Sequence, residues 1–182
     1  GDKRKDIVLV SKVGFAYDEN GKNLGRNSQF QHVIDRAEGC LSRLNTDYLD
    51  LLLIHWPDHD TPFEETIRAL EQLKQSGKIR HYGVSNFTPE MMDECEQYGH
   101  MAANQVGYHM FDRRMESTVL PHCLDKNIGF MAYGTLGFGL LSGAFTPDTN
   151  FGENDWRSSG VAFKLPLFQT EEFAKELRVV ER

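Results

Sequence analysis

The chain of 182 residues has few cysteines, no long apolar run and no extended basic segment. Its three cysteines, Cys40, Cys95 and Cys123, are widely spaced and fall on the apolar faces of expected helices, which favours a reducing cytoplasm over a disulfide framework. No stretch approaches the roughly 20 apolar residues of a membrane span, and the sequence shows no signal-peptide pattern. A formal net charge of −7 and a longest Lys/Arg run at residues 3–5 argue against nucleic acid or an anionic membrane as the main partner.

Apolar runs and helical patterns alternate along the chain. Five of the runs end on a polar side chain that can take part in chemistry. These are residues 7–11 before Lys12, 48–54 before His55, 79–84 before Ser85 and Asn86, 101–104 before Gln105, and 129–132 before Tyr133. The alternation predicts buried strands of βα units in a parallel sheet. Because the carboxyl ends of barrel strands converge on one face, we expect these side chains to line one pocket.

Helix start signals follow the apolar runs. Ser28 with Gln31 is a candidate capping box, Thr61 precedes a second helix, and Thr88 with Pro89 opens a third. Five strands are fewer than the eight strands and about 250 residues of a closed barrel. The pattern therefore predicts a fragment, a partial barrel of about five βα units that forms a single domain over residues 1–182.

Residues 144–169 have no clean periodicity and would be an unusually long loop for a compact domain. The segment contains Phe151, Trp156, Arg157 and Phe163. Loops of this length are usually functional or disordered, and the aromatic content favours an ordered segment. We expect it to be a lid over a ligand site.

Five segments resemble the aldo-keto reductase family in their order and spacing. They are residues 10–14 (VSKVG), 49–57 (LDLLLIHWP), 83–87 (GVSNF), 104–106 (NQV) and 133–143 (YGTLGFGLLSG). The resemblance implies an α/β fold of the (β/α)8 TIM-barrel type that reduces a small aldehyde or ketone. It also implies a nicotinamide cofactor, usually NADPH with NADH as the alternative, bound without a Rossmann domain. The chain indeed has no strand-linked G-x-G-x-x-G with a following ribose-binding acid.

The resemblance implies two catalytic residues in this chain. Hydride transfer to a carbonyl leaves charge on oxygen, so a proton donor and electrostatic help must be near that oxygen. In the family a tyrosine gives the proton, a lysine lowers its pKa, an aspartate holds the lysine, and a histidine orients the carbonyl. Lys12 and His55 match the lysine and the histidine. The tyrosine and aspartate precede the lysine strand in the family, so we expect this fragment to be inactive by itself; Tyr17, a nearby phenol, matches no family segment.

The resemblance also assigns cofactor contacts. Ser85, Asn86 and Gln105 would bind the nicotinamide carboxamide, and Tyr133 would stack on the ring. Gly107 occupies a position at which many relatives carry a larger residue. The pyrophosphate would approach the glycine-rich turn after the last strand, which contains Gly134, Thr135, Leu136, Gly137 and Gly139.

Each assigned residue has a structural alternative. Lys12 could extend its ammonium from a strand end to water, and His55 could be an ordinary core histidine. Ser85 and Asn86 could form a turn before the next helix. A metal site is disfavoured, because His55 and the histidine four residues later lack the helix and the glutamate of a zinc protease motif.

Two other functions are compatible with the same residues. Some members of the family are β subunits of potassium channels, so the chain could belong to a cofactor-binding interaction module with little turnover. Alternatively, Lys12 could be the Schiff-base lysine of a barrel lyase. No feature of the sequence indicates an oligomeric state.

Overall fold

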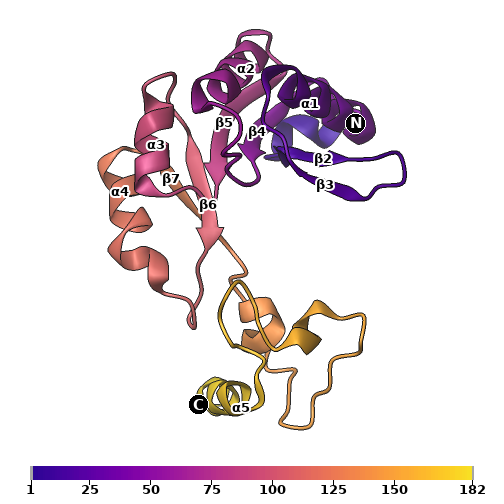
Figure 1. Ribbon diagram of the computed structural model, residues 1–182, viewed down its shortest axis with the longest axis vertical. Helices are drawn as coiled ribbons and strands as arrows, with labels where there is room; N and C mark the ends of the chain where they lie inside the picture. Colours follow the sequence, from indigo (N-terminus) through magenta and orange to yellow (C-terminus); the bar gives the residue numbers. More distant parts are fainter. Residues whose placement is uncertain (1, 182) are drawn as a thin grey trace. The chain divides into compact units, whose positions relative to one another are not determined.

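The computed structural model describes residues 2–181 (Figure 1). The chain divides into two compact units: the first is Gly1–Val106 with Glu116–Met131, and the second is Gly107–Met115 with Ala132–Arg182. The single domain expected over residues 1–182 therefore stays a prediction.

A five-stranded sheet carries all five of the expected strands. The strands are β1 (Val10–Val13), β4 (Leu49–Ile54), β5 (Ile79–Ser85), β6 (Ala103–Gly107) and β7 (Gly129–Tyr133). They lie in the order β1-β4-β5-β6-β7, and the β1/β4, β4/β5 and β5/β6 pairs are parallel. Strands β1 and β6 both begin and end later than their apolar runs do. Lys12 and Gln105 therefore lie within the strands instead of directly after them.

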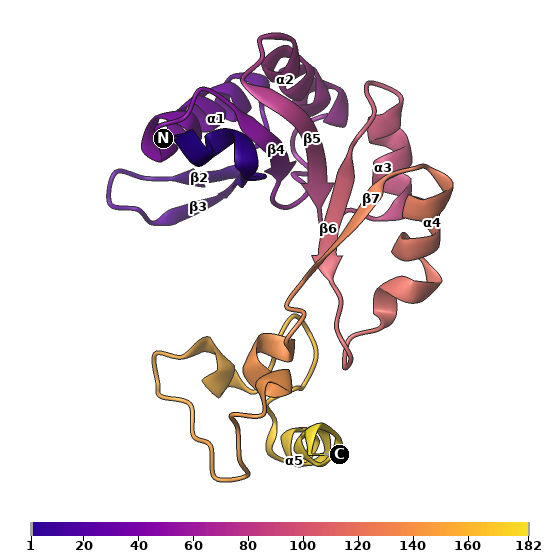
Figure 2. The same ribbon diagram turned by 180° about the vertical axis from the view of Figure 1, so that it is seen from behind.

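Helices alternate with these strands. The α-helices are α1 (Phe30–Leu44), α2 (Phe63–Gln75), α3 (Pro89–Glu96), α4 (Val119–Asp125) and α5 (Thr170–Val180), and the short 3-10 helices are η1 (Asp2–Asp6), η2 (Arg114–Ser117), η3 (Gly137–Ser142) and η4 (Trp156–Ser159). Helices α1 to α4 lie along the sheet, as the reverse view shows (Figure 2). The helical regions expected between the strands are therefore present.

The helix caps differ in part from the sequence prediction. Thr88 caps α3 as expected, with its hydroxyl accepting a bond from a backbone N–H of the first turn at 3.4 Å. Ser28 does not cap α1; the N-cap is Gln29, which makes no side-chain cap bond. The buried carboxylate of Asp58 takes the Ser28 N–H at 2.8 Å and the Thr61 hydroxyl at 2.8 Å. The contact of Asp58 with Ser28 is long-range and its contact with Thr61 is local, and neither Ser28 nor Thr61 caps a helix through its side chain.

The core of the first unit surrounds β4, and the strand ends depend on close packing beside it. Leu52, Leu53 and Ile54 are fully buried, as expected for a central strand covered on both faces. Gly83 lets β6 approach β5, because a Cβ at this position would lie 2.2 Å from the carbonyl oxygen of Ala103. This close approach aligns the carboxyl ends of β5 and β6.

A hairpin occupies residues to which the sequence analysis assigned no strand. It consists of β2 (Phe15–Tyr17) and β3 (Asn23–Arg26), which pair antiparallel. All four residues of β3 are exposed, so the segment has no apolar alternation that could have indicated a strand.

The second unit has its own apolar core. Its buried residues are Leu140, Ala162, Leu167, Phe168, Phe173 and Leu177. Within residues 144–169, η4 and a tight turn closed by Ala162 and Leu165 order the chain. The long segment is therefore folded, and its role as a lid stays a prediction.

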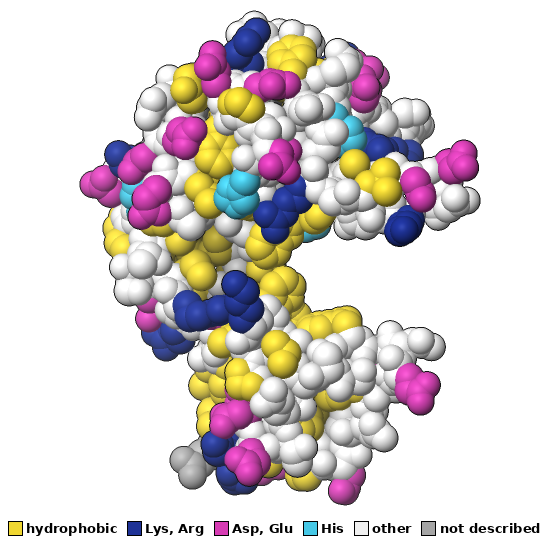
Figure 3. All heavy atoms as spheres, viewed as in Figure 1, with side chains coloured by type: hydrophobic (Ala, Val, Ile, Leu, Met, Phe, Trp, Pro, Cys, Tyr) yellow, Lys and Arg dark blue, Asp and Glu magenta, His cyan; other side chains and the backbone are white. Residues whose placement is uncertain are grey.

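The charged surface of the first unit, the membrane-spanning potential of the helices and possible metal ligands can be described for residues 2–181. Acidic and basic side chains are interspersed on the visible face of the first unit (Figure 3). None of the helices in this range is long and apolar enough to cross a membrane, and no group of three or more His, Cys, Asp or Glu there could hold a metal ion.

Candidate active site

Two backbone hydrogen bonds and one side-chain hydrogen bond connect the carboxyl ends of four neighbouring strands in the first unit. His55, directly after β4, donates its N–H to the carbonyl oxygen of Val13 in β1 at 2.8 Å. Asn86, directly after β5, donates its N–H to the carbonyl oxygen of Gln105 in β6 at 2.9 Å, and its side-chain amide donates to the carbonyl oxygen of His55 at 3.2 Å. These bonds hold the strand ends at one edge of the sheet, and the expected assembly of their side chains into one pocket stays a prediction.

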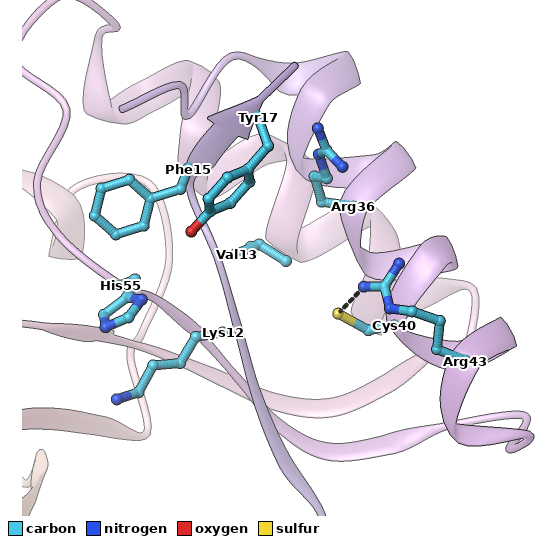
Figure 4. Close-up of a pocket in the computed structure, with 8 residues that line it drawn as sticks. All are labelled: Lys12, Val13, Phe15, Tyr17, Arg36, Cys40, Arg43 and His55. Atoms are coloured by element: carbon cyan, nitrogen blue, oxygen red, sulfur yellow. Dashed lines mark hydrogen bonds between the residues drawn. The ribbon is translucent and has the colours of Figure 1, made fainter. Parts of the chain in front are cut away.

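Lys12 and His55 line one cavity of about 270 Å³ in the first unit (Figure 4). Burial lowers the pKa of Lys12. Burial, and then the neighbouring Lys12 charge, lower the pKa of His55 below its usual 6.5, so its imidazole is neutral at neutral pH. The ring of Phe15 meets the imidazole edge to face, with centroids 5.2 Å apart. The pair can thus present an ammonium and a neutral N–H donor to the same small ligand.

The sequence did not predict the other residues that line this cavity. Tyr17 reaches it from the hairpin strand β2, and Figure 4 shows its hydroxyl turned toward the side of the cavity that carries His55. Arg36, Cys40 and Arg43 reach it from α1, and an Arg43 N–H lies 3.5 Å from the Cys40 sulfur. No sequence motif connects these residues with Lys12, because helix α1 and strand β1 are separated in the sequence and come together only in the folded chain.

Ser85, Asn86 and Gln105 form one hydrogen-bonded group. Ser85 is fully buried, and its hydroxyl donates to the carbonyl oxygen of Gln105 at 2.8 Å while accepting from the Asn86 amide at 3.0 Å. Asn86 has a left-handed backbone with φ 65°. The side-chain oxygen Oε1 of Gln105 is buried and has no hydrogen-bond partner among residues 2–181. An unpaired buried carbonyl oxygen fits the amino group of a primary carboxamide, so this group fits the nicotinamide end of a cofactor.

The ring of Tyr133 in the second unit packs over Gly107. A Cβ at position 107 would come within 3.3 Å of the ring carbons of Tyr133, so a larger residue there would push the ring away. The Tyr108 N–H donates to the Tyr133 carbonyl oxygen at 3.3 Å. Burial is the main cause that raises the pKa of the Tyr133 phenol, which therefore stays protonated at neutral pH. Gly107, the small residue noted in the sequence, thus leaves the space that the Tyr133 ring occupies.

The glycine-rich turn after β7 depends on left-handed backbone. Gly134, Gly137 and Gly139 have φ angles of 66°, 58° and 103°, which favour glycine. The Gly137 N–H donates to the Gly134 carbonyl oxygen at 2.7 Å, and the Gly139 N–H donates to that of Leu136 at 3.2 Å. These bonds are internal to the turn, so the glycines shape the backbone around Thr135 and Leu136. Phosphate contacts at this turn stay a prediction.

The predicted site residues therefore fall into two sets. The first unit brings together Lys12, His55, Ser85, Asn86 and Gln105. The second unit contains Tyr133 and the glycine-rich turn.

A parallel βα fold with reactive side chains at the carboxyl ends of its strands is typical of barrel-type enzymes. The chain belongs to the aldo/keto reductase family, whose model matches residues 1–182. The parallel sheet with its helices is accordingly a partial α/β barrel.

Individual relatives agree with this family. The chain is 38% identical over 167 residues to the aldo-keto reductase YhdN of Bacillus subtilis (strain 168), which covers 92% of this chain and 50% of the relative. Among solved structures, the glycerol dehydrogenase AKR11B4 from Gluconobacter oxydans has a TM-score of 0.89 and 36% identity, covering 99% of this chain and 54% of that one. An aldo-keto reductase from Klebsiella pneumoniae in complex with NADPH has a TM-score of 0.66 and 37% identity, covering 79% and 47%. The chain thus spans about half the length of the relatives it matches.

Proposed function

We propose that the whole protein is an NAD(P)H-dependent oxidoreductase that reduces a small aldehyde or ketone to the alcohol by hydride transfer. The observation that carries the proposal is the placement of Lys12 and His55 in one cavity at the carboxyl ends of β1 and β4. Family membership supports the same reaction class.

His55 is the group that orients the carbonyl. Its neutral imidazole donates a hydrogen bond to the substrate oxygen, and it becomes a stronger partner as negative charge develops there. The cofactor supplies the hydride when it is bound. The Lys12 ammonium adds positive charge on the same side, and burial strengthens its field. Both residues therefore stabilise charge on the substrate oxygen. The proton that completes the alcohol comes, as the family resemblance implies, from a tyrosine of the whole protein whose pKa Lys12 lowers.

Gln105 is the residue that we assign to the nicotinamide carboxamide. Its unpaired Oε1 accepts from the carboxamide amino group, and Asn86 lies beside it through the N–H bond to the Gln105 carbonyl oxygen. Ser85 acts through Gln105, because its hydroxyl is bonded to the carbonyl oxygen of that residue. Tyr133 stacks on the nicotinamide ring by analogy with the family, and the turn of Gly134, Thr135, Leu136, Gly137 and Gly139 approaches the pyrophosphate.

NADPH is the cofactor that we favour, with NADH as the alternative. A Klebsiella pneumoniae relative was solved with NADPH, and the NADH-specific methylglyoxal reductase of Escherichia coli (strain K12) is 30% identical to this chain. We place the protein in the cytoplasm, because all three cysteines are free and buried. We expect the isolated 182-residue chain to be inactive.

A steady-state assay tests the proposed function. The whole protein is mixed with NADPH or NADH and with a small aldehyde such as propanal, and oxidation of the cofactor is followed. We expect turnover, and we expect Lys12→Met to remove most of it while leaving cofactor binding intact. Cofactor binding without turnover on a panel of aldehydes and ketones would favour the channel-subunit type of module. Borohydride trapping of a substrate on Lys12 would favour a Schiff-base lyase.

A further inference from the structure

Two phenylalanines of the second unit stack on each other next to Tyr133. The centroids of the Phe138 and Phe163 rings are 5.2 Å apart with an interplanar angle of 17°, and the Phe163 ring is 5.3 Å from the Tyr133 ring at 54°. Phe163 is 45% exposed. An exposed apolar ring beside a candidate ring-binding residue offers a surface for stacking.

The backbone that carries these rings is strained. Phe138 has φ 57°, Phe163 has φ 49° and Lys164 has φ 70°, all in the left-handed region that bulky residues rarely adopt. Phe163 and Lys164 are the two central residues of a turn closed by reciprocal N–H to carbonyl bonds between Ala162 and Leu165, both 2.8 Å long. Such turns favour asparagine and glycine. Left-handed bulky residues persist where the surroundings hold them, and they are concentrated at ligand sites.

Arg114 and Gly134 provide the surroundings that hold the two rings. An Nη2 hydrogen of Arg114 is donated to the Phe163 carbonyl oxygen at 3.2 Å. The same guanidinium binds the carboxylate of Asp112 through Nε and Nη2, each at 2.8 Å, and this carboxylate is almost fully buried. Gly134 leaves space for Phe138, because a Cβ there would lie 2.7 Å from its ring. The Arg114 guanidinium, held by the buried carboxylate of Asp112, therefore contacts the turn, and Gly134 leaves room for the Phe138 ring.

We propose that Phe138, Phe163 and Tyr133 form a binding surface for a flat ring, and that Arg114 is its positioning residue. This inference rests on the proposed function, in which the flat ring belongs either to the nicotinamide of the cofactor or to an aromatic carbonyl substrate. Both sources present the same chemistry, an aromatic face that stacks on another ring. Phe163 then determines how tightly that ring is bound.

Replacing Phe163 tests the surface directly. In the whole protein, Phe163→Ala should weaken binding by about three- to tenfold, the range expected for the loss of one ring contact. The Kd of NADP⁺ is measured by calorimetry, and the KM is measured for benzaldehyde and for propanal. A higher Kd identifies the nicotinamide as the ring; an unchanged Kd with a higher KM for benzaldehyde alone identifies the substrate. If none of the three constants changes, the surface binds no ring and the inference is wrong.

Two further variants separate ring stacking from bulk and from damage to the fold. Phe163→Leu keeps apolar volume without a flat face, so it should behave like Phe163→Ala; full retention of wild-type constants would overturn the inference. Tyr98→Ala removes another exposed aromatic side chain, in the first unit, and should change nothing. If the wild-type protein neither binds NADP⁺ nor reduces either aldehyde, the proposed function fails, whereas normal wild-type behaviour with an inert Phe163 rejects only this inference.

The positioning role of Arg114 is tested by a double-mutant cycle. Arg114→Ala should weaken ring binding about as much as Phe163→Ala does, and the double variant should be little worse than either single variant, because both changes remove one surface. Arg114→Lys should restore binding only in part, since lysine cannot bind Asp112 with two parallel bonds. Effects that simply add would show that Arg114 stabilises the unit without positioning Phe163.

Discussion

At the scale of single residues, the site combines side chains that a motif can identify with side chains that only the fold brings in. Lys12 and His55 could be placed near strand ends because each follows a short apolar run, which is the sequence pattern of a buried strand. Arg43 of α1 lines the same cavity. It could not have been predicted, because its helical position indicates only an exposed face. Strand periodicity therefore predicts residues at strand ends, but it does not show which helical residues surround them.

His55→Ala separates catalysis from cofactor binding. In the whole protein, kcat/KM for a small aldehyde should fall by about 10²–10⁴-fold, the range for a positioned polarising group. The affinity for NADPH should stay within a few-fold, because the imidazole contacts the substrate oxygen. Steady-state kinetics and a cofactor titration on the same preparation check both expectations. Near-normal turnover would show that His55 is structural.

Gln105→Ala should have the opposite signature. Removing the amide deletes the acceptor that we assign to the carboxamide, so the Kd of NADPH should rise by about tenfold, as for the loss of one hydrogen bond of about 1.4 kcal/mol. Gln105→Glu is the matched variant, because it keeps an acceptor and nearly the same shape. It should bind the cofactor more tightly than the alanine variant does. Equal Kd values for the wild type and the alanine variant would show that Gln105 does not bind the cofactor.

At the scale of elements, the sequence could predict buried strands and locally capped helices. Strand β4 is covered on both faces and has a continuous apolar run, and Thr88 caps α3 through its own first turn. The hairpin of β2 and β3 could not be predicted, since β2 has only three residues and all four residues of β3 are exposed. The start of α1 depends on Asp58, which is 30 residues from Ser28 in the sequence. Local patterns fail where a distant side chain takes the hydrogen bond.

Glu176 makes helix α5 sensitive to pH. Burial, and then the nearby Glu172 charge, raise the pKa of Glu176 from its usual 4.5 to about 7. Its buried Oε2 has no hydrogen-bond partner within residues 2–181. Between pH 4.5 and 7 the folded chain holds this proton and the unfolded chain does not, so stability falls as pH rises through this window. Glu176→Gln should therefore stabilise the chain at pH 8 by about 1–2 kcal/mol, a value reduced for partial solvent exposure, and have little effect at pH 4.

Urea unfolding of the 182-residue chain at these two pH values measures the effect of Glu176→Gln. Glu153→Gln, at an exposed position in a turn of the same unit, is the control, and Glu176→Gln should stabilise the chain more than this control does at pH 8. An equal change for Glu176→Gln at both pH values would contradict the raised pKa.

At the scale of the whole molecule, the strand order leaves β1 at one edge of the five-stranded sheet. Within residues 2–181, β1 pairs with β4 on one side only. Apolar residues are exposed at this edge: Val10 is 36% exposed, and Ile7 and Val8 before it are 50% and 79% exposed. An apolar strand edge with unpaired backbone groups is a template for association with another chain.

A charge on this edge should keep copies of the 182-residue chain apart. We expect the wild-type chain to self-associate as its concentration rises, and we expect Val10→Lys to shift it toward the monomer, because lysine on an edge strand opposes strand pairing. Leu44→Lys is the matched control: Leu44 is 45% exposed but lies at the end of helix α1, where no backbone edge is open. Size-exclusion chromatography with light scattering over a concentration series compares the three proteins. A wild-type chain that stays monomeric throughout, or an equal shift by both lysines, would show that the β1 edge does not drive association.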